Sequence, residues 1–96
     1  MYEVNNRSFY AIIPANVRYD KRLSSSAKLL YGEITALCNG KGFCHTTKGY
    51  FAQLYGVSEQ CVGRWISSLK KEGYIYAETL YAKHKGGLRY LELCIL

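Results

Sequence analysis

The fold is decided by residues 46–73, which read TTKGYFAQLYGVSEQCVGRWISSLKKEG. Apolar residues recur in it at helical spacing on both sides of a short break around Gly56. The first group is Phe51, Leu54 and Tyr55, and the second is Val62, Trp65, Ile66 and Leu69. Apolar residues three and four positions apart form one face of a helix. The stretch therefore predicts two short helices joined by a tight turn.

The residues around the break favour a close crossing of the two helices. Thr46 or Thr47 offers a hydroxyl N-cap to the first helix, and Ser58 offers one to the second. Gly56 supplies a residue that tolerates positive φ, and Ala52, four positions earlier, is small enough to face a crossing helix. This combination is typical of a helix-turn-helix motif. A helical hairpin without a ligand stays open as the alternative.

The residues before this motif predict a strand and a helix. Phe9–Ile13 is aromatic and β-branched and ends at Pro14, which indicates a short strand followed by a polar connector over residues 15–22. Three serines, Ser24–Ser26, then offer N-caps to a helix that should end at Asn39-Gly40. Its apolar face consists of Ala27, Leu30, Tyr31, Ile34, Leu37 and Cys38. A glycine-rich loop with a few residues of strand is expected over residues 40–45.

The residues after the motif change from helical spacing to strand character. Gly73 closes the last helix, and residues 74–82 and 88–96 predict two strands around a basic turn at residues 83–87. Three helices and a C-terminal hairpin define an α+β winged helix-turn-helix with a short N-terminal strand. The chain should form one domain over residues 1–96. Because it ends on the apolar run Cys94-Ile95-Leu96, we expect it to be the N-terminal module of a longer protein.

Composition and charge restrict the classes of function. The formal net charge is +6, which favours an anionic partner such as nucleic acid. No apolar run approaches the ~18 residues of a membrane span, and the polar start is no signal peptide, so a cytoplasmic protein is expected. The single Asp and the two histidines form no recognisable catalytic motif, so we expect no enzyme.

The four cysteines raise the question of a metal site. Cys38, Cys44 and His45 are three potential zinc ligands within eight residues, but no Cys-x-x-Cys pair and no second close pair of ligands accompany them. Cys38 and Cys61 also fall on helical spacings, where a free thiol behaves as a small apolar residue. We expect reduced structural thiols, no metal and no cofactor.

The helix-turn-helix motif predicts which residues would contact DNA. Its second helix would lie in the major groove with Val62, Trp65, Ile66 and Leu69 turned inward. The residues expected to face the bases are Ser58, Glu59, Gln60, Gly63, Arg64, Ser67 and Lys71. Arg64 can pair bidentately with guanine and Gln60 with adenine, whereas Glu59 either accepts from cytosine or only stabilises the first helical turn. The residues expected to contact phosphate or the minor groove are Thr46, Thr47, Lys48, Lys83, His84, Lys85 and Arg89.

Longer stretches of the chain resemble a known family. The run FYAIIPANVRYD at residues 9–20 is continued by residues 23–34, 50–58, 62, 65–69 and 73–75. Together they resemble the N-terminal domain of phage replisome organisers and related plasmid replication initiators. The resemblance covers about residues 9–76. It implies a winged-helix module that binds the replication origin, often tethered to a C-terminal domain that recruits helicase-loading machinery. Gly63 departs from the Ser or Thr often found at that point of the recognition helix, which leaves the base preference open.

Double-stranded DNA is therefore the expected partner, and sequence-specific origin binding is the expected function. A homodimer, and replication proteins reached through a C-terminal region outside this sequence, are further partners left open. Two alternatives also stay open: a transcriptional regulator on the same fold, and a winged helix used for protein interaction.

Overall fold

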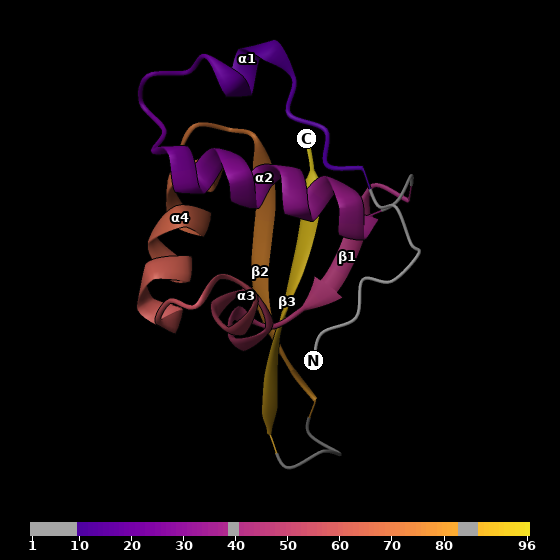
Figure 1. Ribbon diagram of the computed structural model, residues 1–96. Helices are drawn as coiled ribbons and strands as arrows, with labels where there is room; N and C mark the ends of the chain where they lie inside the picture. The colour runs from indigo at the N-terminus through magenta and orange to yellow at the C-terminus, as the bar shows by residue number, and fades with distance from the viewer. Residues whose placement is uncertain (1–9, 39–40, 83–86) are drawn as a thin grey trace.

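The computed structural model describes residues 10–38, 41–82 and 87–96. These described residues form four helices and three strands (Figure 1). In chain order they are α1 (Ala15–Arg18), α2 (Ser25–Cys38), β1 (Phe43–Thr46), α3 (Lys48–Tyr55), α4 (Glu59–Lys71), β2 (Ile75–Ala82) and β3 (Leu88–Ile95). The three predicted helices and the C-terminal hairpin are confirmed.

The strands form one antiparallel sheet in the order β1-β3-β2. The β2–β3 hairpin pairs from Ile75 with Ile95 down to Ala82 with Leu88. Figure 1 shows α2 running across the strands, with α3 and α4 on the same side of the molecule. Because side chains alternate along a strand, only one face of the sheet can meet these helices. Leu91 and Leu93 on that face are buried.

One apolar core joins the helices to the sheet. Its largest fully buried side chains are Val17, Leu30, Ile34, Phe51, Val62, Leu69, Ile75 and Leu93. They come from every element except β1, whose Cys44 packs against the same cluster while half-buried. Burial of such side chains is the dominant stabilising contribution in a domain of this size.

The predicted caps begin the helices where expected. Ser24 Oγ accepts from the N–H of Ala27 at 3.1 Å ahead of α2. At the start of α3, Thr47 Oγ1 accepts from the backbone N–H of Tyr50 at 3.0 Å. At the start of α4, Ser58 Oγ accepts from the backbone N–H of Cys61 at 3.2 Å. The predicted stop at Asn39-Gly40 lies outside the described residues.

The predicted N-terminal strand is wrong for the residues that the structure describes. Residues 10–13 are neither strand nor helix, and Phe9 lies outside the described part. Ile12 instead donates its N–H to Thr35 Oγ1 of α2 at 2.9 Å. Ile13 lies so close to Gly32 that a methyl group there would approach its Cγ1 to 3.0 Å. The segment therefore packs on a helix, because its β propensity has no partner strand to act on.

One further element differs from expectation, and one agrees with it. The connector expected to be irregular begins with the helical turn α1, which Pro14 precedes in an extended conformation. In the glycine-rich loop, the few expected residues of strand are β1, which pairs with β3 from Phe43 to Thr46.

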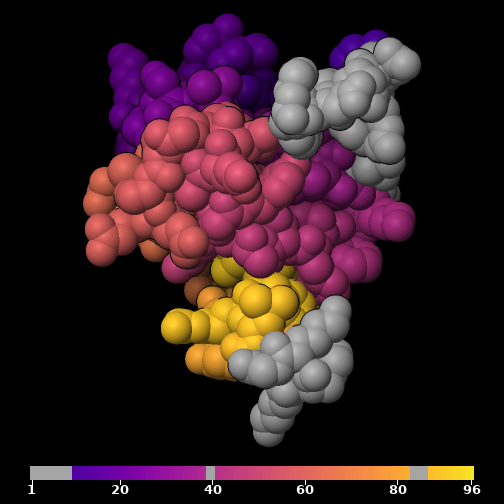
Figure 2. Space-filling view, turned by 60° about the horizontal axis from the view of Figure 1, so that its bottom comes forward, coloured from indigo at the N-terminus to yellow at the C-terminus, as the bar shows by residue number. Residues whose placement is uncertain are grey.

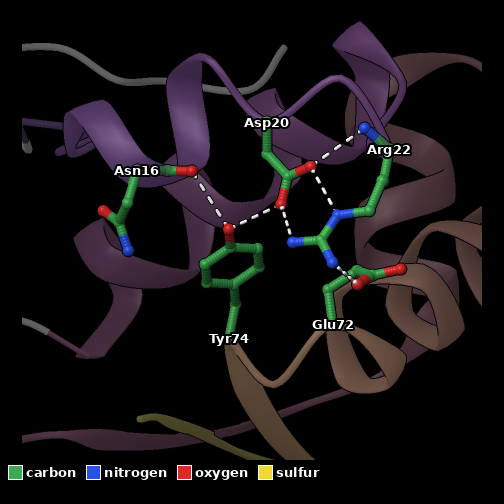
Figure 3. A network of polar contacts seen from close by, with 5 residues as sticks. All are labelled: Asn16, Asp20, Arg22, Glu72 and Tyr74. Atoms are coloured by element: carbon green, nitrogen blue, oxygen red, sulfur yellow. Dashed lines mark hydrogen bonds and ion pairs between the residues drawn. The ribbon is translucent and has the colours of Figure 1, made fainter.

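A polar network fastens α1 and the turn after it to the end of α4 and the start of β2 (Figure 3). The Asp20 carboxylate accepts from the backbone N–H and the guanidinium of Arg22 at 2.7–2.9 Å, and from the Tyr74 hydroxyl at 2.6 Å. Tyr74 also lies 3.0 Å from the carbonyl of Asn16, and Arg22 pairs with Glu72 at 2.8 Å. The Asp20 side chain is only 5% exposed. Its charge is therefore compensated almost entirely by protein groups.

These contacts change the titration of the network. The Arg22 guanidinium and the Tyr74 hydroxyl hold the pKa of the Asp20 carboxyl well below its ordinary value of 3.8. The same carboxylate raises the pKa of Tyr74. A carboxyl whose pKa is lowered on folding stabilises the fold above its unfolded pKa, and this contribution fades as the pH falls toward the folded pKa.

We expect Asp20→Asn to lower the melting temperature at pH 7, because the amide cannot carry the charge that binds Arg22. As the pH falls from about 5, just above the unfolded pKa, to about 2, the gap between wild type and variant should shrink, since wild-type Asp20 progressively loses its advantage there. Thermal unfolding followed by circular dichroism across this range measures both. A gap independent of pH would contradict the role assigned to the Asp20 charge.

Candidate nucleic-acid interface

The corner between α3 and α4 has the expected geometry. Gly56 takes a left-handed conformation with φ 68°, and the N–H of Val57 bonds back to the carbonyl of Ala52 at 3.0 Å. Ala52 is buried. An L-residue with a Cβ is strained at such a φ, so glycine is the residue that this turn requires. The turn fixes the angle at which α4 leaves α3.

Tyr55 and Trp65 hold the two helices together beside this turn. Their rings meet edge to face with centroids 6.1 Å apart, and the Tyr55 hydroxyl donates to Glu33 of α2 at 3.4 Å. Burial and the Glu33 carboxylate raise the pKa of Tyr55, which stays a neutral donor. Trp65 is half-buried, whereas the other three residues predicted to face inward, Val62, Ile66 and Leu69, are buried.

The outward face of α4 carries most of the residues predicted to face the bases. Those exposed to solvent are Ser58, Glu59, Gln60, Arg64, Ser67 and Lys71, and Gly63 is half-buried among them. Ser58 uses its hydroxyl as the helix cap, so it is already engaged. Gln60 and Arg64 lie one turn apart on the exposed face, at the spacing that places two side chains side by side. The structure thus brings the two predicted base-contacting side chains together.

Arg64 has a neighbour that the sequence did not identify. Its guanidinium donates to the Cys61 sulfur at 3.1 Å, one turn toward the start of the helix. This follows the general tilt of helical side chains toward the N-terminus. Cys61 therefore holds the guanidinium near the N-terminal half of α4, which is the part of a recognition helix that meets base edges. In the sequence, the spacing of three residues between Cys61 and Arg64 could have predicted this contact.

The Lys48 side chain does not stay with Thr46 and Thr47 at the start of α3, where a phosphate contact was predicted. Although it begins α3, its side chain crosses to α4, so that a methyl group on Gly63 would lie 3.6 Å from Nζ and 3.8 Å from Cε. The ammonium group thus occupies the space above the glycine on the outward face of α4. Because Gly63 has no side chain, the Lys48 ammonium group can lie against α4 at this position.

Glu59 makes the reverse crossing, from α4 to the start of α3. A methyl group on Gly49 would lie 3.2 Å from its Oε2. The carboxylate therefore stands at the N-terminal turn of α3, where the helix dipole favours a negative charge. Thr47 Oγ1 at the same turn already accepts from Tyr50, and Thr46 is half-buried at the end of β1. The expected phosphate site at this helix start is partly filled by the protein's own groups.

A groove separates this corner from the hairpin. It has a volume of about 460 Å³ and is lined by Thr47, Lys48, Gly49, Glu59, Thr79, Leu88, Arg89, Tyr90 and Leu91. Figure 2 shows the hairpin projecting beyond the body of the molecule next to α3 and α4. Arg89 is exposed on the hairpin side of the groove. The other predicted hairpin contacts, Lys83, His84 and Lys85, lie outside the described residues.

The cysteines are free thiols in the structure. Cys38 is buried at the end of α2, and burial raises the pKa of Cys44 to about 12. Such a thiol stays protonated at neutral pH. The described residues contain no group of three potential ligands arranged to hold a metal ion.

A family model for the helix-turn-helix domain matches residues 21–75, from the turn before α2 to the first residue of β2. The chain belongs to this helix-turn-helix family. Membership indicates a DNA-binding domain, in agreement with the exposed polar face of α4. No curated protein and no solved structure matches the chain significantly. In the described part of the chain, no helix is both long enough and apolar enough to cross a membrane.

Two glycine substitutions should have opposite effects on stability. We expect Gly56→Ala to lower the free energy of unfolding by about 1–2 kcal/mol, because alanine is strained in the left-handed region. Gly63→Ala should raise it by up to ~1 kcal/mol, because alanine favours the helix and a methyl group fits against Lys48. Urea unfolding of both variants measures the difference. A gain in stability for Gly56→Ala would contradict the strained turn.

Proposed function

We propose that this helix-turn-helix domain binds double-stranded DNA sequence-specifically, with α4 in the major groove and the β2–β3 hairpin as a wing. The supporting observation is the face that α4 shares with α3, where Gln60, Arg64 and the Lys48 ammonium are exposed together. Amides and cations are the side chains that pair with adenine and guanine edges. The proposal is a binding module rather than an enzyme.

We further propose that Lys48 reads a base edge and does not only neutralise a phosphate. Its ammonium stands above Gly63 and not over the start of its own helix. A lysine in that position reaches the groove alongside Arg64, and lysine pairs with the O6 and N7 atoms of guanine. Among the described residues, Lys71 at the end of α4 and Arg89 beside the groove are exposed cations that would contact phosphate.

The replication role is proposed from the resemblance to replisome organisers and plasmid initiators. Selection of duplexes from a random library, followed by a search for the selected sequence around the gene, tests it. Repeated sites beside the gene, together with a gene for a helicase loader, support origin recognition. A single site at a promoter would assign the domain to transcriptional regulation instead. A homodimer would show as two half-sites ~34–36 Å apart or a multiple of that distance.

Duplex affinity should fall with salt concentration, with a log–log slope of about −0.9 for each phosphate neutralised. We expect Arg89→Met to make the slope shallower by about that amount, because one phosphate contact is lost. Fluorescence anisotropy with one selected duplex, at salt concentrations from roughly 50 to 200 mM, measures it. No duplex binding at about 50 mM salt, or an affinity that does not change with salt, would favour a protein-interaction role.

Arg64→Ala and Lys48→Met should both cost ~1–3 kcal/mol on the selected duplex and much less on a random one. Both side chains are placed to contact bases, so their loss reduces specificity. Lys41→Met, an exposed lysine before β1, is the matched control and should change little. If Lys48→Met weakens selected and random duplexes equally, Lys48 is a phosphate contact and the base assignment is wrong.

A further inference from the structure

The face of the sheet that points away from the helices has a composition of its own. Because the face holding Ile75, Ala77, Leu91 and Leu93 meets the core, the alternate residues of each strand lie on the opposite side. We call this opposite side the outer sheet face. Its residues are Phe43, His45, Tyr76, Glu78, Leu80, Ala82, Leu88, Tyr90, Glu92 and Cys94.

Aromatic rings cover much of the outer sheet face. Phe43 and Tyr76 are 44% and 41% exposed at opposite edges of the sheet. On β1 beside Phe43, the ring of His45 lies 5.8 Å from that of Phe43 and 5.5 Å from that of Tyr90 on β3, measured between centroids. Such a contiguous group of exposed rings is typical of a surface that contacts another molecule.

Two carboxylates lie in the middle of these rings. Glu78 pairs directly opposite Glu92 in the β2–β3 register. Like charges at opposite positions destabilise a sheet. Each carboxylate has one local partner: Glu92 lies 3.2 Å from His45 Nε2, and Glu78 accepts from the Tyr76 hydroxyl. The outer sheet face, as described by the structure, contains no Lys or Arg, although the chain carries a net charge of +6.

We propose that the outer sheet face docks a segment of another protein that presents Lys or Arg between apolar side chains. The cation would stand between Glu78 and Glu92 and remove their mutual repulsion, while the apolar groups would cover Phe43 and Tyr76. Complementary charge of this kind determines which partner is accepted.

Charge also argues against a second copy of this chain as the occupant. A two-fold pairing of outer sheet faces would bring the two carboxylates of each copy together, with no Lys or Arg from either described face to separate them. The exposed α4 face of a second copy is not the occupant either, because under the proposed function that face binds DNA. Because α3 and α4 lie on the other side of the sheet, a segment centred on Glu78 and Glu92 would leave the exposed face of α4 free for the duplex.

Nuclear magnetic resonance with the isotope-labelled full chain tests the proposal. The probe is a synthetic peptide of alternating Leu and Lys, compared with a Leu–Glu peptide and a Ser–Lys peptide. We expect the Leu–Lys peptide to shift the amide signals of β1, β2 and β3, and the other two peptides to have little effect. The double variant Glu78→Gln/Glu92→Gln should weaken Leu–Lys binding about threefold to tenfold, the range for two exposed ion pairs. This variant should remain folded, because it removes a like-charge pair.

The matched control is Glu33→Gln/Glu59→Gln, which changes the net charge equally but away from the outer sheet face. It should leave the binding of the Leu–Lys peptide unchanged. Equal weakening in both double variants, or equal binding of the Ser–Lys peptide, would show only general attraction and overturn the proposal. Signal shifts confined to α3 and α4 would overturn it too. Concentration-dependent shifts of the outer sheet face without peptide would assign it to a second copy.

Discussion

The structure depends on how the apolar stripe of α4 is buried. Val62, Ile66 and Leu69 enter the core, and each such side chain contributes ~1.5–3 kcal/mol when fully buried. An exposed ion pair contributes ~0–1 kcal/mol, so the stripe and not the surface charges sets the rotation of α4. The turn at Gly56 then sets its direction. Once rotation and direction are fixed, Gln60 and Arg64 can only point outward, and the interface follows from core packing.

Features that depend on neighbouring residues in the chain were predictable from the sequence. The hydroxyl caps Thr47 and Ser58 satisfy N–H groups two or three residues away, and Gly56 is required by a single backbone angle. Helical and strand periodicities are likewise set within a few residues. These local rules agreed with one another over residues 46–73, which is why the helices, the turn and the outward face of α4 were predicted together.

Features that depend on contacts between elements were not predictable. Lys48 above Gly63 joins residues fifteen positions apart on different helices, and no periodicity links them. The network of Asp20 with Tyr74 spans 54 positions. The same limit explains the wrong N-terminal strand, because residues 10–13 have strand composition but meet α2 through Thr35. A strand requires a partner, and composition does not supply one.

The distribution of charge follows from the same burial. Once the helices cover one face of the sheet, the exposed cations Lys48 and Arg89 line the groove between α3 and the hairpin. Glu78 and Glu92 are left together on the opposite face. Under the proposed function, this division of charge would favour approach of a duplex to the first side over the second. The repulsion between the two carboxylates lowers the stability of the fold. Core packing does not require it, because polar uncharged residues would suit an exposed sheet equally well. A feature that lowers stability without a structural need is expected where a surface has another use.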